Sequence, residues 1–113
     1  MKPENEDLLR RLAVVDESVV ESLFGTVLGG PEPAEPDAKT VALVRLAGLV
    51  ALDSASASYQ WSVTAALAAG ASDDEVVGVL VALTPVVGTA RVASAAPEVA
   101  LAIDCDLGLP SDG

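Results

Sequence analysis

Apolar and polar positions in the first third of the chain follow the spacing of an amphipathic α-helix. Two apolar stripes, separated by Asp16, predict helix over residues 5–28 in two pieces. Asp16 is of a residue type that often caps a new helix. The glycine pair at 29–30 is predicted to end the second piece, because glycine adopts the left-handed conformation that closes a helix. Residues 31–38 are rich in proline and are predicted to form a loop.

A second apolar run predicts a helix from Ala38 to about Leu52. Asp37 stands directly before it and is a suitable cap. Apolar residues cover most of the circumference of this helix, and only Lys39 and Arg45 are charged. A helix that is apolar on nearly all sides is expected to be buried on nearly all sides.

The next segment, SASASYQWSVTAALAAGAS at residues 54–72, carries no charge and is rich in serine and alanine. It holds the only tyrosine and the only tryptophan of the chain. The segment is predicted to form a helix that is capped by Asp53 and Ser54 and ends at Gly70. Its small side chains suit helices that approach one another closely.

The sequence Ser-Asp-Asp-Glu that follows is a capping box. Ser72 can accept a hydrogen bond from the backbone of Glu75, and the Glu75 side chain can accept one from the backbone of Ser72. The helix that begins here is predicted to continue to about Val87. Pro85 is expected to kink or end it, because proline lacks the N–H that a helix interior requires.

A last helical stretch is predicted from Gly88 to about Ile103, interrupted or restarted at Pro97. No segment shows the sustained alternation of apolar and polar residues that is typical of strands. The predicted fold class is all-α: a compact bundle of five to six short helices. One domain is expected over residues 1–113, divided into N-terminal helices (1–30), a Pro-rich loop (31–38), a helical core (39–103) and a flexible acidic tail (104–113).

Composition narrows the classes of partner. The formal net charge is −11, with six Lys and Arg residues in 113, which argues against nucleic acid and against anionic membrane surfaces. The longest candidate membrane span, residues 76–90, is shorter than the roughly 20 residues that a span requires. The N-terminus is polar and acidic, unlike a signal peptide, so a cytoplasmic protein is expected.

The chain lacks the residues on which several kinds of catalysis and metal binding usually depend. The chain has no histidine and one cysteine, which removes Ser-His and Cys-His nucleophile pairs, dithiol redox pairs and the commonest transition-metal ligand. Asp104 and Asp106 flank Cys105 and are interpreted as a solvated acidic tail. Asp73 and Asp74 are explained by their place at a helix start. No metal and no other cofactor is therefore expected.

Two arginines stand nearly alone among apolar residues, and an arginine in such surroundings needs an anion. For Arg45 and Arg91 the anion is interpreted as Glu98, Asp53 or a carboxylate from another subunit. The alternative is the carboxylate of a bound ligand.

Polar side chains in the uncharged helix are the remaining candidates for a site. Ser58 and Ser62 are four residues apart, which places them one turn apart on one face of the helix. The candidate pocket consists of these residues and their polar neighbours: Ser58, Tyr59, Gln60, Ser62, Arg45 and Arg91.

The order of segments carries a family resemblance. An apolar helix, TVALVRLAGLVAL, is followed by a small-residue helix that ends AALAAG, then by the capped ASDDEVVGVLVALTPVVG, and last by TARVASAAPEVALA. This order resembles the carboxymuconolactone decarboxylase-like family, which includes the alkylhydroperoxidase D-like proteins. Residues 65–88 match best, and looser similarity extends over about 39–102. The resemblance implies an all-helical fold and an obligate oligomer, a trimer or hexamer in which subunits share helices.

The family's functional positions can be carried over by counting back from Gly70. Ser62 then stands where the family often has its active-site histidine. Ala55 and Ser58 stand where the redox branch has its Cys-x-x-Cys, and Leu43 lies near the position of that branch's acidic residue. The chain thus resembles a divergent member that lacks both the cysteine motif and the histidine.

Three hypotheses about function follow. The favoured one is a divergent family-like helical oligomer without a redox centre, with a non-catalytic binding or scaffold role. The alternative is a non-redox enzyme or small-ligand binder that acts on a small carboxylate or lactone in a pocket near Ser58 and Ser62, where arginine and hydrogen-bond donors would polarise a carbonyl. The minor alternative is family-type peroxidase activity. Whether the chain is an enzyme stays open.

Overall fold

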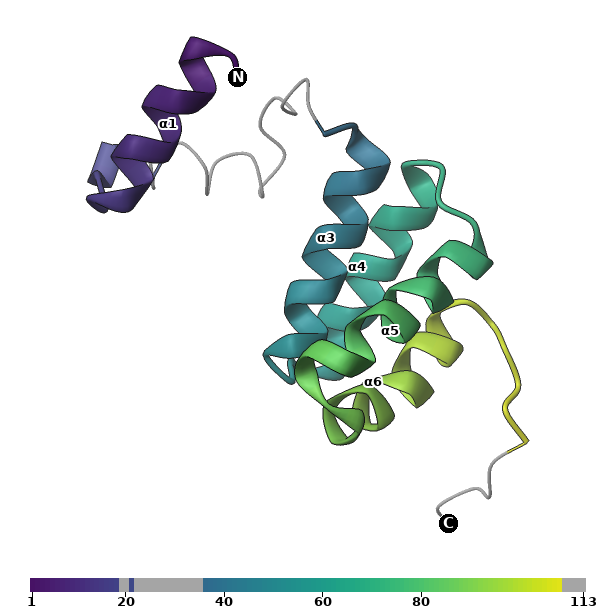
Figure 1. Ribbon diagram of the computed structural model, residues 1–113. Helices are drawn as coiled ribbons and strands as arrows, with labels where there is room; N and C mark the ends of the chain where they lie inside the picture. The colour runs from purple at the N-terminus through teal and green to yellow at the C-terminus, as the bar shows by residue number, and fades with distance from the viewer. Residues whose placement is uncertain (19–20, 22–35, 109–113) are drawn as a thin grey trace. The chain divides into compact units, whose positions relative to one another are not determined.

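The computed structural model describes residues 1–18, 21 and 36–108 of the chain. Within these ranges the backbone forms five helices and no strand, which confirms the predicted all-α class. The chain divides into two units, Met1–Ala34 and Glu35–Gly113, and each is described here by itself. The helices shown in Figure 1 are α1 (Pro3–Ala13), α3 (Ala38–Ala51), α4 (Ser56–Ala68), α5 (Asp73–Val87) and α6 (Thr89–Ala102).

In the first unit, α1 begins two residues earlier than predicted. Proline is at home in the first turn of a helix, where its missing N–H would have no partner, so Pro3 starts α1. The predicted break at Asp16 is confirmed: its Oδ1 accepts from the backbone N–H of Ser18 at 3.0 Å, and residues 17, 18 and 21 are helical. The rest of the second helical piece, the glycine pair and residues 31–35 lie outside the described residues.

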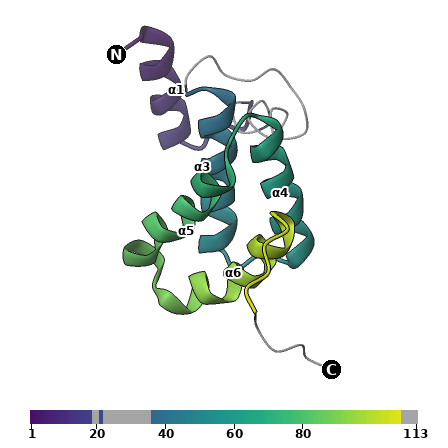
Figure 2. The ribbon, with the colours of Figure 1, turned by 90° about the vertical axis from the view of Figure 1, so that its right-hand side faces the viewer.

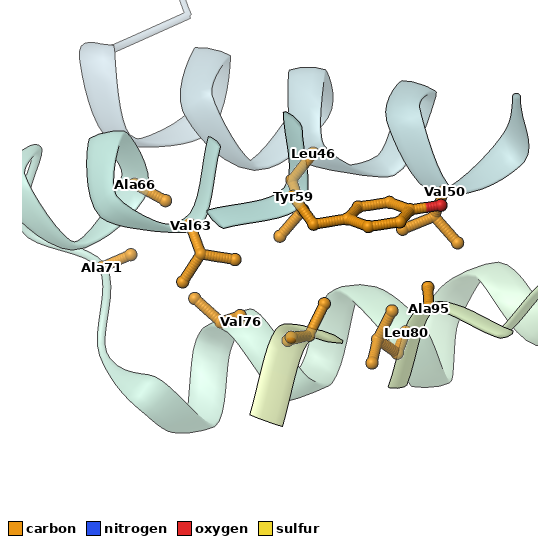
Figure 3. Packing of buried hydrophobic residues seen from close by; sticks show 10 residues of the cluster. Leu46, Val50, Tyr59, Val63, Ala66, Ala71, Val76, Leu80 and Ala95 are labelled. Atoms are coloured by element: carbon orange, nitrogen blue, oxygen red, sulfur yellow. The ribbon is translucent and has the colours of Figure 1, made fainter. Parts of the chain in front are cut away.

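The second unit is built from the four helices α3 to α6. Helix α3 packs against α4 and α5, and α6 packs against α4 and α5 (Figures 1 and 2). Figure 3 shows buried side chains of these helices packed together around Tyr59. The buried cluster draws on all four helices and consists of Leu46, Val50, Tyr59, Val63, Ala66, Ala71, Val76, Leu80, Ala95 and Val99.

Helix α3 begins as predicted but is less buried than predicted. Asp37 caps it, since its Oδ1 accepts from the backbone N–H of Thr40 at 2.8 Å. Only Leu46 and Val50 of this helix are buried, and Val44 is 61% exposed. The expectation of burial on nearly all sides is wrong for a single chain, because α4, α5 and α6 cover only part of the circumference of α3.

The start of α4 differs from the prediction, and its end agrees with it. Ala55, not Asp53 or Ser54, occupies the N-cap position, and it supplies no side-chain hydrogen bond. Asp53 adopts a left-handed backbone (φ 54°) and turns its carboxylate toward α6 instead. At the other end, Gly70 has φ 102° and the N–H of Ala71 bonds to the carbonyl of Ala66 at 3.0 Å, as in a Schellman closure.

The capping box at the start of α5 is confirmed. The Ser72 hydroxyl accepts from the N–H of Glu75, and Glu75 Oε1 accepts from the N–H of Ser72, both at 3.0 Å. Helix α5 runs through Pro85, which lies in its last turn, and ends at Val87.

Among the described residues, no helix has both the length and the apolar character needed to cross a membrane.

Helix α6 is continuous, so the predicted interruption at Pro97 is wrong. Ala95 precedes the proline and Val99 and Ala100 follow it, and all three are buried against the other helices. This packing stabilises a helical backbone on both sides of the residue that would otherwise disrupt it. Beyond α6, residues 104–108 form no regular structure and are exposed.

Candidate functional site

The candidate residues of α4 point to different sides of the helix. Tyr59 and Ser62 are each 2% exposed and belong to the interior, where Tyr59 lies between α3 and α6 (Figure 3). Ser58 is half-buried, and Gln60 is exposed. These four residues therefore do not line one common wall.

The hydroxyl of Tyr59 is the best-defined polar group of the candidate set. It donates a hydrogen bond to the carbonyl oxygen of Leu49 at 3.5 Å. Burial is the largest cause that raises the pKa of Tyr59, and the negative charge of Asp53 raises this pKa further. Ser54 and Arg91 lower it by less, and Glu98 has the smallest effect, which raises it. The phenol is thus held in its neutral form, in which it can donate a hydrogen bond but cannot act as a base at neutral pH.

The two arginines have different surroundings. Arg91 lies exposed on α6, so water can solvate its guanidinium and a buried counter-anion is not required. Arg91, Asp53 and Glu98 each act electrostatically on the Tyr59 hydroxyl. Arg45 lies half-buried on α3 and takes part in an interaction of its own.

Two polar links between distant segments were not predicted from the sequence. Ser94 on α6 donates to Asp53 Oδ1 at 3.2 Å, which joins the loop after α3 to the last helix. Lys39 Nζ lies 3.0 Å from Glu75 Oε2, which joins the start of α3 to the start of α5. Neither pair has a local sequence signal, because its members come together only through the packing of helices.

The surface of the second unit has two hollows of note. One lies between α3 and α5, has a volume of about 240 Å³, and is lined by Thr40, Leu43, Val44, Ala47, Val79, Ala82 and Leu83. The other lies beside the end of α6, has a volume of about 380 Å³, and is lined by Pro97, Ala100, Leu101, Asp104, Cys105, Asp106 and Leu107.

Neither hollow is lined by a residue of the candidate set. The pocket beside Ser58 and Ser62 therefore stays a prediction. In the described ranges, no three Asp, Glu, Cys or His side chains are grouped so that they could hold a metal ion. Cys105 is exposed and lies outside the helices.

The hollow between α3 and α5 is different in character, because Thr40 is its only polar residue. Three further residues extend its apolar rim. Gly48 follows Val44 by one turn of α3, Gly78 precedes Ala82 by one turn of α5, and Val86 follows Val79 by two turns. We refer to these three residues and the seven that line the hollow as the α3–α5 face.

Comparisons of the chain with protein-family models, with curated proteins and with solved structures gave no match. The resemblance to carboxymuconolactone decarboxylase-like proteins therefore remains a hypothesis that rests on the order of the helices and on the motifs of residues 65–88.

Proposed function

We propose that the chain is a non-catalytic helical protein that acts by binding, as a homo-oligomeric scaffold. One observation carries the proposal: past its first turn, α5 has no charged side chain, yet much of it is exposed. Val81 is 68% exposed and Val86 is 78% exposed. Single exposed apolar residues are ordinary on protein surfaces, whereas a contiguous apolar helix face is typical of a binding surface.

The candidate polar residues support a role without catalysis. Catalysis needs groups that converge on one reacting atom. Here Ser62 and Tyr59 belong to the core, Gln60 faces solvent, and the buried phenol is kept in its neutral form. The chain also has no histidine to activate a serine.

Light scattering on the full chain tests the scaffold. At a chain concentration well above the micromolar range and about 0.15 M salt, where charges are screened beyond about 8 Å, we expect a mass of at least two chains of 11.3 kDa. A mass of one chain under these conditions would remove the basis for a self-assembling scaffold.

Binding of a small carboxylate or lactone is the second candidate function, and one observation favours it. The charge of Arg91 acts on the Tyr59 hydroxyl, and a guanidinium and a phenol are both donors suited to a carbonyl or carboxylate oxygen. NMR titration with succinate and with γ-butyrolactone tests it. Shifts at Tyr59 and its neighbours that vanish in Arg91→Gln would support this function, and the absence of saturable shifts would exclude it for these probes.

A further inference from the structure

The hollow between α3 and α5 is an exposed apolar feature built from two helices of the same unit. Val44 lines it from α3 and is 61% exposed, and Ala82 lines it from α5 and is exposed. The spacing of its residues, 40, 43, 44 and 47 on α3 and 79, 82, 83 and 86 on α5, is the i, i+3, i+4, i+7 pattern of a helix face. Such a face commonly lies against another helix.

The charge of the chain limits what can cover this face. The chain carries −11, so two copies repel one another over most orientations. The α3–α5 face carries no charged residue, and it therefore lets two copies approach with the least electrostatic cost. An anionic membrane would be repelled by the remainder of the chain, and a basic partner would be drawn to the acidic residues and not to this face.

We propose that the α3–α5 face binds the same face of a second copy of this chain. The proposal rests on the scaffold function above and names its contact surface. A two-fold arrangement is the commonest in homo-oligomers, and one whose axis runs perpendicular to α5 would set the acidic starts of the two α5 helices, Asp73–Glu75, at opposite ends of the contact.

Two glycines of the face support a close approach of helices from another copy. Gly48 and Gly78 lie inside helices, where glycine is less favourable than alanine by roughly 1 kcal/mol. A Cβ at either position would meet nothing within 4 Å in the chain itself. The described residues thus give no packing reason for either glycine, whereas a partner helix at close range would.

The size of the α3–α5 face limits the affinity expected between two copies. Helices of 14 and 15 residues are each about 21–22 Å long, so the face is at the small end of specific interfaces. We therefore expect association in the micromolar range and not tighter.

Sedimentation velocity on the full chain tests the surface with matched variants. Val44→Lys places a charge in the face, and Leu101→Lys places the same charge on a residue of α6 that is 66% exposed and does not line this hollow. Both reduce the net charge, so neither adds repulsion between copies. We expect Val44→Lys to weaken association at least tenfold and Leu101→Lys to leave it within about twofold, with unchanged helical circular dichroism in both. If Val44→Lys associates as tightly as the wild type, or if both variants weaken association equally, the proposed surface is wrong.

Gly78→Ala gives an independent measurement. If the chain has no partner at this face, alanine stabilises the helix and leaves association unchanged. If the face is covered by a second copy, we expect a higher unfolding temperature of the dissociated chain together with weaker association.

A wild-type chain that is monomeric would overturn the scaffold itself, whereas a wild-type oligomer that persists unchanged in Val44→Lys and Gly78→Ala would overturn only the assignment of its surface.

Discussion

Glu75 uses its two carboxylate oxygens for two different contacts. Oε1 accepts from the backbone N–H of Ser72 within the capping box, and Oε2 lies 3.0 Å from Lys39 Nζ. The hydrogen bond from Lys39 is the largest cause that lowers the pKa of Glu75, and the bond from the Ser72 backbone lowers it further. The same pair raises the pKa of Lys39. One residue thereby joins the first turn of α5 to the first turn of α3.

This pairing predicts loss of stability in acid. The pKa of Glu75 is lower in the folded chain than its ordinary value of 4.5, so the unfolded chain takes up the proton first. The stabilising contribution of Glu75 is therefore complete above pH 4.5 and is lost as the pH falls through the lowered native pKa. Thermal unfolding of wild type and Glu75→Gln measures it as a function of pH.

Glutamine can keep the hydrogen bond of the capping box, so this variant isolates the ion pair. We expect the wild type to melt at a higher temperature at neutral pH and the difference to shrink on acidification. The ion pair is exposed enough to be screened, so added salt should reduce the difference too. A difference that is independent of both pH and salt would contradict this account.

At the scale of helices, α4 and α5 follow one another along the chain but start in different ways. Helix α5 starts with a complete capping box, whereas α4 starts at Ala55 with no side-chain cap. Asp53, one of the two residues that could have capped α4, instead accepts a hydrogen bond from Ser94 on α6. The start of α4 is therefore the less protected of the two.

Opposite substitutions at these two N-caps should have opposite effects. Ser72→Ala removes a side-chain acceptor from the first turn of α5, and we expect it to lower the free energy of unfolding by about 1 kcal/mol. Ala55→Ser supplies an acceptor to the first turn of α4, and we expect a gain of about 0.5–1 kcal/mol. Urea unfolding monitored by circular dichroism measures both. If Ala55→Ser has no effect, the first turn of α4 already has another partner for its N–H groups.

Helix boundaries were predictable from the sequence where the signal is local. The box at Ser72 and Glu75, the cap at Asp37 and the glycine at position 70 all act within a few residues of themselves. The N-cap of α4 was not predictable, because Asp53 is as good a cap by sequence as Asp37. Its actual contact with Ser94 lies 41 residues away and exists only once α6 has packed.

The candidate site shows the same limit. Counting along a helix places Ser58 and Ser62 one turn apart, but it does not say which residue of the helix faces its neighbours. Tyr59 and Val63 pack in the space between the helices, and this orients α4 so that Ser62 is buried and Gln60 is exposed to solvent. The apolar residues around Arg91 in the sequence also suggested apolar surroundings for its side chain, whereas in the structure Arg91 is exposed on α6.

At the scale of the whole molecule, charge and apolar surface oppose one another. The net charge of −11 keeps copies apart, and the exposed valines of α3 and α5 favour their association. The balance depends on ionic strength, because salt screens the repulsion between copies and leaves the apolar contact intact.

Self-association should therefore strengthen with salt. We expect the dissociation constant of the proposed homo-oligomer to fall severalfold when sodium chloride is raised from about 0.05 M to about 0.5 M, where the screening length shortens by a factor of about three. Sedimentation at a series of salt concentrations measures it. Association that weakens with salt would show that ion pairs hold the copies together and would argue against an apolar contact.

Cys105 is a natural site for attaching a spin label to this protein. It is the only cysteine of the chain, and it is exposed just beyond the end of α6. A nitroxide label attached there needs no substitution elsewhere, and each copy then carries one electron spin at the same place. Pulsed electron resonance on the assembled protein would return a single separation for a symmetric dimer or trimer and several for a hexamer. The single thiol would thus report the symmetry of the proposed assembly.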